Sequence, residues 1–108
     1  MPQKASKAKD VQTAEQILNL PVDRIRPFDN HPFKVNDDDE LMQQTIDSIL
    51  QVGVLNPVIV RPAEDGWYQM VSGHRRLRAC ELAGIATIPA ISRVLNDYEA
   101  IHLMVDSN

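Results

Sequence analysis

The chain has 108 residues, which is enough for one compact domain with a single core. Apolar residues make up 44% of it and charged residues 24%, as in globular proteins, and its net charge of −4 excludes a protein that attracts polyanions through bulk charge. Its single cysteine excludes a disulfide framework within one chain, and no apolar run approaches the roughly 18 residues of a membrane span, so we predict a cytoplasmic protein with no membrane partner.

The first half of the chain predicts a tail, a strand and a helix. Residues 1–16 are polar and lysine-containing, so we expect a flexible tail. Residues 17–25 alternate in part and predict a strand, in which Pro21 indicates an edge position or a strand end. After a proline-containing loop, Asn36 and Asp37 are suited to cap a helix whose apolar positions continue to Leu50 and which Gly53 ends.

The second half predicts a hairpin followed by alternating elements. Strands are expected at residues 58–61 and 67–72, a helix at 75–83, a strand at 87–91 and a helix at 97–105. The order β-α-β-β-α-β-α predicts an α/β (α+β) domain over residues 17–108, with a small mixed sheet and flanking helices. The last residues still follow a helical pattern, so we expect the chain to be a fragment of a longer protein.

The most informative stretch is the passage from the second hairpin strand into the next helix. The glycine before the helix allows an anion to approach the backbone closely, and the first N–H groups of the helix carry partial positive charge. The guanidinium groups that follow can add charge-assisted hydrogen bonds to the anion. Because no acidic residue follows until Glu81, the basic group is expected to lack a counter-charge. We therefore predict a phosphate site; a capped surface helix with a solvated basic face is the alternative. Its residues are Ser72, Gly73, His74, Arg75 and Arg76.

Other candidate residues carry weaker signals. The loop at residues 53–57 is explained by a helix end and a strand start, although the Asn56 amide could read a base edge. The acidic residues 37–40 suit the positive end of a helix and need no metal to explain them. Cys80 is expected to be buried rather than reactive. Asp106 and Asn108 could help to hold Mg²⁺, although the pattern alone favours a fraying terminus.

Four motifs, in order, give the chain a family resemblance from about residue 20 to its end. They are Leu20-Pro21-Val22-Asp23-Arg24-Ile25, Ser48-Ile49 with the run from Gly53 to Pro62, the run from Ser72 to Ala79, and Leu82-Ala83-Gly84 with Ile88-Pro89. On these motifs the chain resembles the N-terminal domain of ParB partition proteins, which are also catalogued as ParB-like nuclease domains. The variant with His-Pro-Phe at 31–33 and Gly-His-Arg-Arg at 73–76 looks like the proteins of plasmids and integrative elements.

The resemblance implies a domain that binds CTP with Mg²⁺ and thereby closes a dimer into a clamp on DNA. It implies that the triphosphate is held at residues 72–76 and that Mg²⁺ has help from Asn108. It also implies DNA and a partition ATPase as partners of the full protein, a nucleoid location, and a helix-turn-helix that this chain lacks. The implied base site is formed by Gly53, Val54, Asn56 and Pro57.

Two departures from the family pattern affect these expectations. His74 replaces a glutamate, which affects hydrolysis more than phosphate binding, and hydrolysis, if any, should be slow because no general base is evident. Asn56 replaces a glutamine, which keeps the amide but shortens its reach and leaves the choice of base open. The His74-Arg75 pair implies nucleotide phosphate binding in general, so ATP is possible as well as CTP. Sulfiredoxin shares the fold, but its catalytic cysteine corresponds to Gly73, which excludes its chemistry here. A metal-dependent nuclease and a non-catalytic interaction module are the alternative functions.

Overall fold

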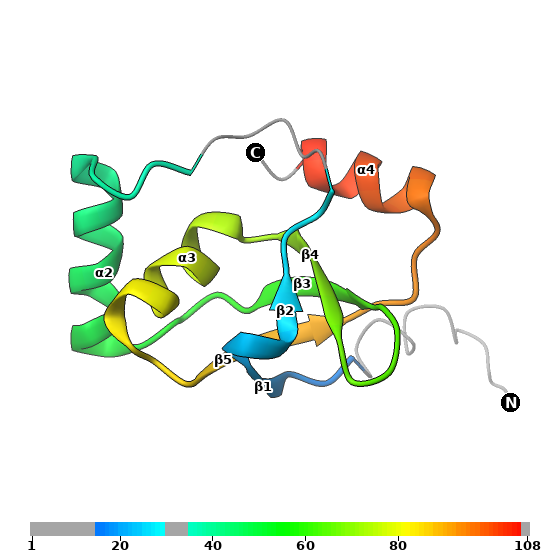
Figure 1. Cartoon of the computed structure of the whole chain (residues 1–108), viewed down its shortest axis with the longest axis horizontal. Coiled ribbons are helices and arrows are strands. Elements are labelled where there is room, and N and C mark those ends of the chain that lie inside the picture. The colour runs from blue at the N-terminus through cyan, green and yellow to red at the C-terminus, as the bar shows by residue number, and fades with distance from the viewer. Residues whose placement is uncertain (1–14, 30–34, 107–108) are drawn as a thin grey trace, which may run out of the picture.

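The computed structural model describes residues 15–29 and 35–106. A five-stranded mixed sheet in the order β1-β5-β3-β4-β2 carries three helices (Figure 1). The strands are β1 (Leu18–Pro21), β2 (Ile25–Arg26), β3 (Val58–Pro62), β4 (Tyr68–Ser72) and β5 (Thr87–Ser92). The helices are α2 (Glu40–Val52), α3 (His74–Ala83) and α4 (Asp97–Asp106), and a 3-10 turn, η1 (Val22–Arg24), separates β1 from β2. The predicted mixed sheet with flanking helices is confirmed.

The strand predicted within residues 17–25 is confirmed as β1, but the segment also supplies a second strand, β2, on the opposite edge of the sheet, which the sequence did not predict. β1 pairs antiparallel with β5, whereas β2 pairs parallel with β4. The Val22 N–H donates to the Ala86 carbonyl at 2.9 Å, so η1 is tied to the loop before β5. Since only η1 joins the two edges, the sheet must curl. Pro21 ends an edge strand, as its missing N–H predicts.

The start of α2 also differs from the prediction. Its cap is Asp39, whose Oδ1 accepts from the Met42 N–H at 2.7 Å, rather than Asn36 or Asp37. The Asn36 side chain instead accepts from the Asp38 N–H at 3.1 Å and forms a turn before the helix. Gly53 ends the helix at a φ of 80°, as predicted.

The main core lies between the sheet and α3, and α2 packs on the outer side of α3 (Figure 1). Leu77, Ala79 and Cys80 are the buried residues of α3. The predicted burial of Cys80 is confirmed, and burial raises the pKa of its thiol. α3 is therefore the central helix, packed between the sheet and α2.

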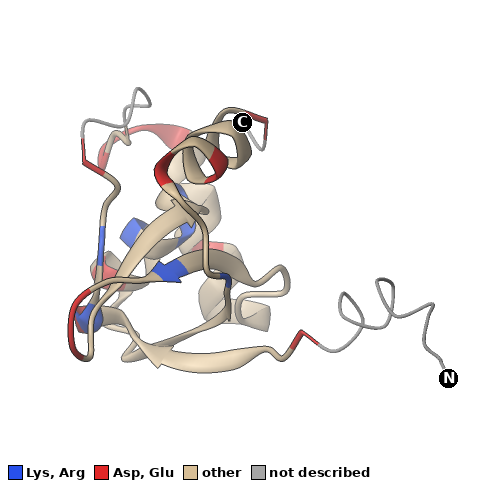
Figure 2. Ribbon diagram, turned by 90° about the vertical axis from the view of Figure 1, so that its right-hand side faces the viewer, with Lys and Arg blue, Asp and Glu red and all other residues tan. Residues whose placement is uncertain are grey.

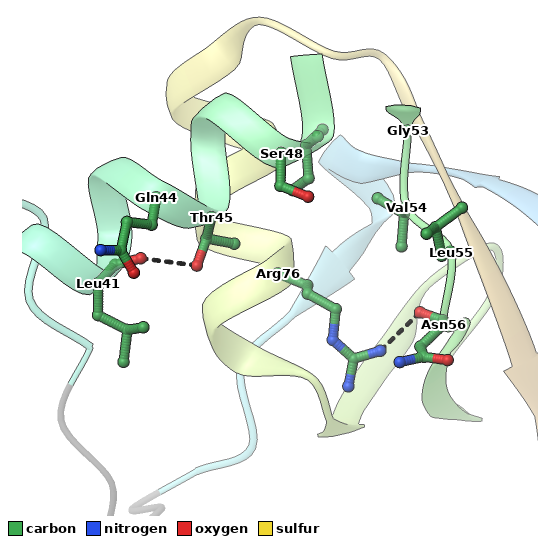
Figure 3. A pocket seen from close by; sticks show the side chains of 10 residues that line it. Leu41, Gln44, Thr45, Ser48, Gly53, Val54, Leu55, Asn56 and Arg76 are labelled. Carbon is green, nitrogen blue, oxygen red and sulfur yellow. Dashed lines mark hydrogen bonds between the residues drawn. The ribbon is translucent and has the colours of Figure 1, made fainter. Parts of the chain in front are cut away.

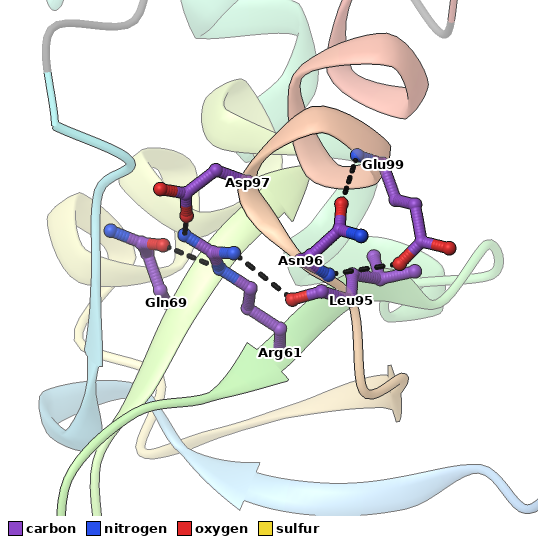
Figure 4. A network of polar contacts seen from close by, with 6 residues as sticks. All are labelled: Arg61, Gln69, Leu95, Asn96, Asp97 and Glu99. Atoms are coloured by element: carbon purple, nitrogen blue, oxygen red, sulfur yellow. Dashed lines mark hydrogen bonds and ion pairs between the residues drawn. The ribbon is translucent and has the colours of Figure 1, made fainter.

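A second, smaller core attaches α4 to β4. It consists of Phe28, Val71, Ala100 and Met104. Arg61 of β3 fixes the start of α4 by donating to the Leu95 carbonyl at 3.0 Å and to Asp97 Oδ1 at 2.8 Å (Figure 4). None of the helices in the described part of the chain has the length and apolar character to span a bilayer.

Candidate functional site

The turn from β4 into α3 requires a glycine for reasons of packing. Gly73 has a φ of 113°, and a Cβ added there would lie 2.5 Å from Val58 Cγ1 of β3. The Leu77 N–H makes the first backbone bond of the helix, to the Gly73 carbonyl at 3.0 Å. The N–H groups of the first turn therefore have no acceptor within the helix and present partial positive charge at the surface. The fold alone thus accounts for Gly73, and the positive helix end follows from it.

Arg78 is fully engaged by carboxylates. Its Nε and Nη2 donate to the two oxygens of Asp37 at 2.9 and 2.8 Å, and its Nη1 donates to Glu81 at 3.0 Å. These bonds raise the pKa of Arg78 above its ordinary range. The expectation that the basic group lacks a nearby counter-charge is therefore wrong for this arginine, because folding places the acidic residues before α2 against α3.

Arg75 is held more loosely. Its Nη1 lies 3.5 Å from Asp39 Oδ1, within range of an ion pair, and makes no hydrogen bond with any residue that the structure describes. The same Asp39 oxygen already accepts from the Met42 N–H. Figure 2 shows the acidic stretch that leads into α2 and the basic residues of α3 in the same part of the molecule. Arg75 thus has an acidic neighbour without a strong bond to it.

Arg76 joins the two segments that the sequence singled out. Its Nη1 donates to the carbonyls of Asn56 and Pro57 at 2.6 and 3.1 Å, and its Nη2 lies 3.3 Å from the position that a Gly73 Cβ would take. Burial lowers the pKa of its guanidinium, and no carboxylate of the described segments pairs with it. A half-buried cation without a carboxylate is stabilised when an anion approaches its remaining donors.

A cavity of about 370 Å³ lies beside Arg76. It is bounded by α2 on one side and by the loop after α2 on the other (Figure 3). Three of the four predicted base-site residues, Gly53, Val54 and Asn56, line it. The fourth, Pro57, does not line it, but its carbonyl accepts a hydrogen bond from Arg76. Its size and its mixed lining suit a small organic ligand with a polar edge.

The wall that α2 contributes was missed by the sequence reasoning. Gln44, Thr45 and Ser48 face the loop across the cavity (Figure 3). The signal was present, because residues 44 and 48 are four apart and share a face of a helix. The sequence analysis did not single out this face, since nothing local indicates that a loop lies opposite it.

The predicted phosphate residues do not all point the same way. Ser72 is the buried last residue of β4 and Gly73 is the turn, so both contribute backbone geometry. The His74 side chain lines a different hollow of about 160 Å³, together with Asp37, Leu77 and Arg78. Only its backbone N–H belongs to the positive end of α3. Arg75 and Arg76 are thus the two side chains with capacity for an anion.

A protein-supplied metal centre is not formed by the parts of the chain that the structure describes. Residues 15–29 and 35–106 contain no group of three or more histidine, cysteine or acidic side chains placed to hold an ion. His31 and Asn108 lie outside these ranges, and the expected role of Asn108 stays a prediction. The Asp37 to Glu40 run is accounted for by the helix cap and the arginine pairs.

Comparisons with known proteins agree on one family. The ParB N-terminal domain family matches residues 6–108. A chromosome-partitioning protein Spo0J of Thermus thermophilus is 38% identical over 97 residues, which cover 90% of this chain and 35% of that protein. The chain therefore spans about a third of the length of such curated relatives.

Solved structures give the same result. ParB of Caulobacter crescentus complexed with CTP-gamma-S has a TM-score of 0.76 and 32% identity, covering 83% of this chain and 51% of that one. Its complex with the centromeric parS site has a TM-score of 0.71 and 29% identity, covering 84% and 46%. Sulfiredoxin of Arabidopsis thaliana has a TM-score of 0.65 and 27% identity, covering 82% of this chain and 97% of that one. The predicted likeness to both fold relatives is confirmed.

Proposed function

Because this chain belongs to the ParB N-terminal domain family, we propose that it binds CTP, with the triphosphate at the start of α3 and the cytosine in the cavity beside α2. The observation that carries the proposal is the position of Arg76. One guanidinium contacts the loop at Asn56 and Pro57 and also lies next to Gly73. A ligand that fills the cavity and carries an anion would meet both halves of the site at this side chain.

The phosphates would be held by two kinds of donor. The backbone N–H groups of the first turn of α3 supply fixed partial charge, and the free donors of Arg75 and Arg76 supply full charges. Arg78 would contribute to the fold rather than to the ligand, because its donors are bound to Asp37 and Glu81. We propose that Mg²⁺ is held mainly by the phosphate oxygens, as is usual for this ion, with Asn108 as a candidate ligand.

The base would lie between the loop after α2 and the polar wall of the helix. The Asn56 amide is available to pair with a base edge, since the bond to Arg76 uses its backbone carbonyl. Gln44 and Ser48 offer further polar groups on the opposite wall. ATP remains a second nucleotide to be tested, because a shorter amide than the family glutamine leaves more space.

In the full protein we propose that nucleotide binding gates a clamp formed by two copies of the chain around DNA, with a partition ATPase as a further partner. The support is the likeness to ParB proteins whose structures contain CTP-gamma-S or the parS site. The metal-dependent nuclease gains no support, because the described segments form no metal cluster. The interaction module is the outcome to be expected if no nucleotide binds.

Calorimetric titration of the chain with CTP, ATP and GTP, each with and without Mg²⁺, tests the proposal. CTP should bind, and Arg76→Ala should weaken it by about 10- to 150-fold, the range for losing a hydrogen bond to a charged group. Arg93→Ala is the matched control, because Arg93 pairs with Glu15 and does not line the cavity. Heat from none of the nucleotides would favour the interaction module. Equal weakening by both variants would indicate attraction by overall charge alone.

A further inference from the structure

We infer that Asp39 competes with anionic ligands for Arg75 and thereby lowers the affinity of the site for them, most strongly for the most highly charged ligand. The inference rests on the proposed function and concerns how that site is regulated. It assigns to Asp39 a second role beside its cap of α2.

The geometry of Asp39 suits a counter-ion that can be displaced. Its Oδ1 accepts from the Met42 N–H at 2.7 Å, and this bond fixes the carboxylate at the start of α2. The same oxygen lies 3.5 Å from Arg75 Nη1, too far for a strong hydrogen bond. Arg75 Nη1 is buried and has no hydrogen-bond partner among the described residues, so an anion that reached it would meet an unpaired donor while Asp39 keeps its bond to the helix.

The neighbouring pair behaves differently. Asp37 binds Arg78 through two parallel bonds of 2.9 and 2.8 Å, the arrangement in which a carboxylate and a guanidinium match best. A ligand phosphate would have to break both bonds to reach Arg78. Of the two acidic residues that meet α3, only Asp39 holds its arginine weakly enough to be exchanged.

The competition depends on ligand charge. Asp39 repels a nearby anion and also reduces the attraction of Arg75 for it, and both effects grow with the number of charges on the ligand. A monophosphate is therefore penalised less by Asp39 than a triphosphate is. Asp39 should therefore lower the affinity for every phosphate ligand, and most strongly in absolute terms for the most charged one.

The variant Asp39→Asn tests this role with little change to the helix, because asparagine caps a helix about as well as aspartate. Asp38→Asn is the matched control. It removes the same charge at the adjacent position, and the Asp38 side chain has no hydrogen bond or ion pair with the described residues. Thermal unfolding of both variants checks that α2 is still capped. Calorimetry then measures the affinities of CTP, CMP and inorganic tripolyphosphate at two salt concentrations.

Asp39→Asn should tighten CTP and tripolyphosphate roughly three- to tenfold, and CMP less, with the gain shrinking at high salt. Asp38→Asn should change each affinity by less than about twofold. Equal effects of the two variants on a CTP site that does bind would overturn the inference and leave the proposed function standing. An equal gain for CMP and CTP would also overturn it, because a merely loosened helix would act on all ligands alike. Absence of binding by all three ligands, in wild type and variants, would overturn both.

Discussion

Replacement of Gly73 by alanine should destabilise the protein severely, and the structure allows the cost to be divided into two parts. The first part is the backbone, because a φ of 113° disfavours any residue with a Cβ, at about 1–2 kcal/mol. The second part is the collision of that Cβ with Val58 Cγ1 at 2.5 Å, and such overpacking costs about 1–3 kcal/mol. Together they predict a loss of about 2–5 kcal/mol from a total of about 5–15 kcal/mol.

Gly84→Ala is the control that separates the two parts. Gly84 has a φ of 73°, and a Cβ added there would have no atom within 4 Å. This variant should show the backbone cost without the collision, and the entropy that alanine removes from the unfolded chain affects both variants equally. The difference between the two variants should therefore be about 1–3 kcal/mol, the cost of overpacking alone.

Urea unfolding followed by circular dichroism measures both free energies, and thermal unfolding should show a lower midpoint for Gly73→Ala by roughly 10–30 °C. Adding Val58→Ala to Gly73→Ala should cost less than the sum of the two single changes, because the colliding methyl group is gone. If Gly73→Ala were no more harmful than Gly84→Ala, the close approach of the β4–α3 turn to β3 would be refuted.

Two further predictions concern single side chains. Cys80 is fully buried, and burial raises the pKa of its thiol. An aromatic disulfide reagent at pH 8 should therefore label it only after the protein is unfolded by urea. Rapid labelling of the native protein would contradict the position of Cys80 in the core. The Arg78 guanidinium lowers the pKa of the Asp37 carboxyl below 3.8, so their pairing stabilises the fold fully above that pH and is lost as the pH falls through the lowered value. Asp37→Asn should therefore be less stable than wild type at pH 7, with a difference in urea midpoint that vanishes on acidification, and a difference that grew at low pH would contradict the pairing.

Local signals predicted most of the fold. Gly53 and Gly84 end their helices at positive φ, and the apolar periods placed α3, α4 and the hairpin strands to within one or two residues, whereas α2 begins later than predicted. The split of the first strand was missed because it depends on pairing with two strands more than forty residues away. The alternation of apolar and polar residues along the chain looks the same whether a segment forms one strand or two strands with different partners.

The candidate site was predicted in its segments but not in its charges. The sequence predicted an anion site at the start of α3, and the family resemblance implied a base site after α2. The structure brings these two segments together at Arg76, and their binding roles stay predictions. One partner of Arg78, Asp37, lies 41 residues earlier in the chain, so a local window shows only the other partner, Glu81. The cavity wall from α2 was missed for the same reason, since a polar helix face looks alike in solvent and opposite a loop.

The course of the chain from β1 to β2 also bears on how copies of this protein meet one another. Both exposed rims of the sheet come from one continuous stretch, in which β1 has four residues and ends at Pro21 and β2 has two. These short edge strands offer few unpaired N–H and C=O groups to a strand of another molecule, which disfavours edge-to-edge aggregation. If this stretch detached from the sheet, the backbones of β4 and β5 would both be exposed. A cleavage or a destabilising substitution there would therefore create two edges that can pair with strands of other molecules.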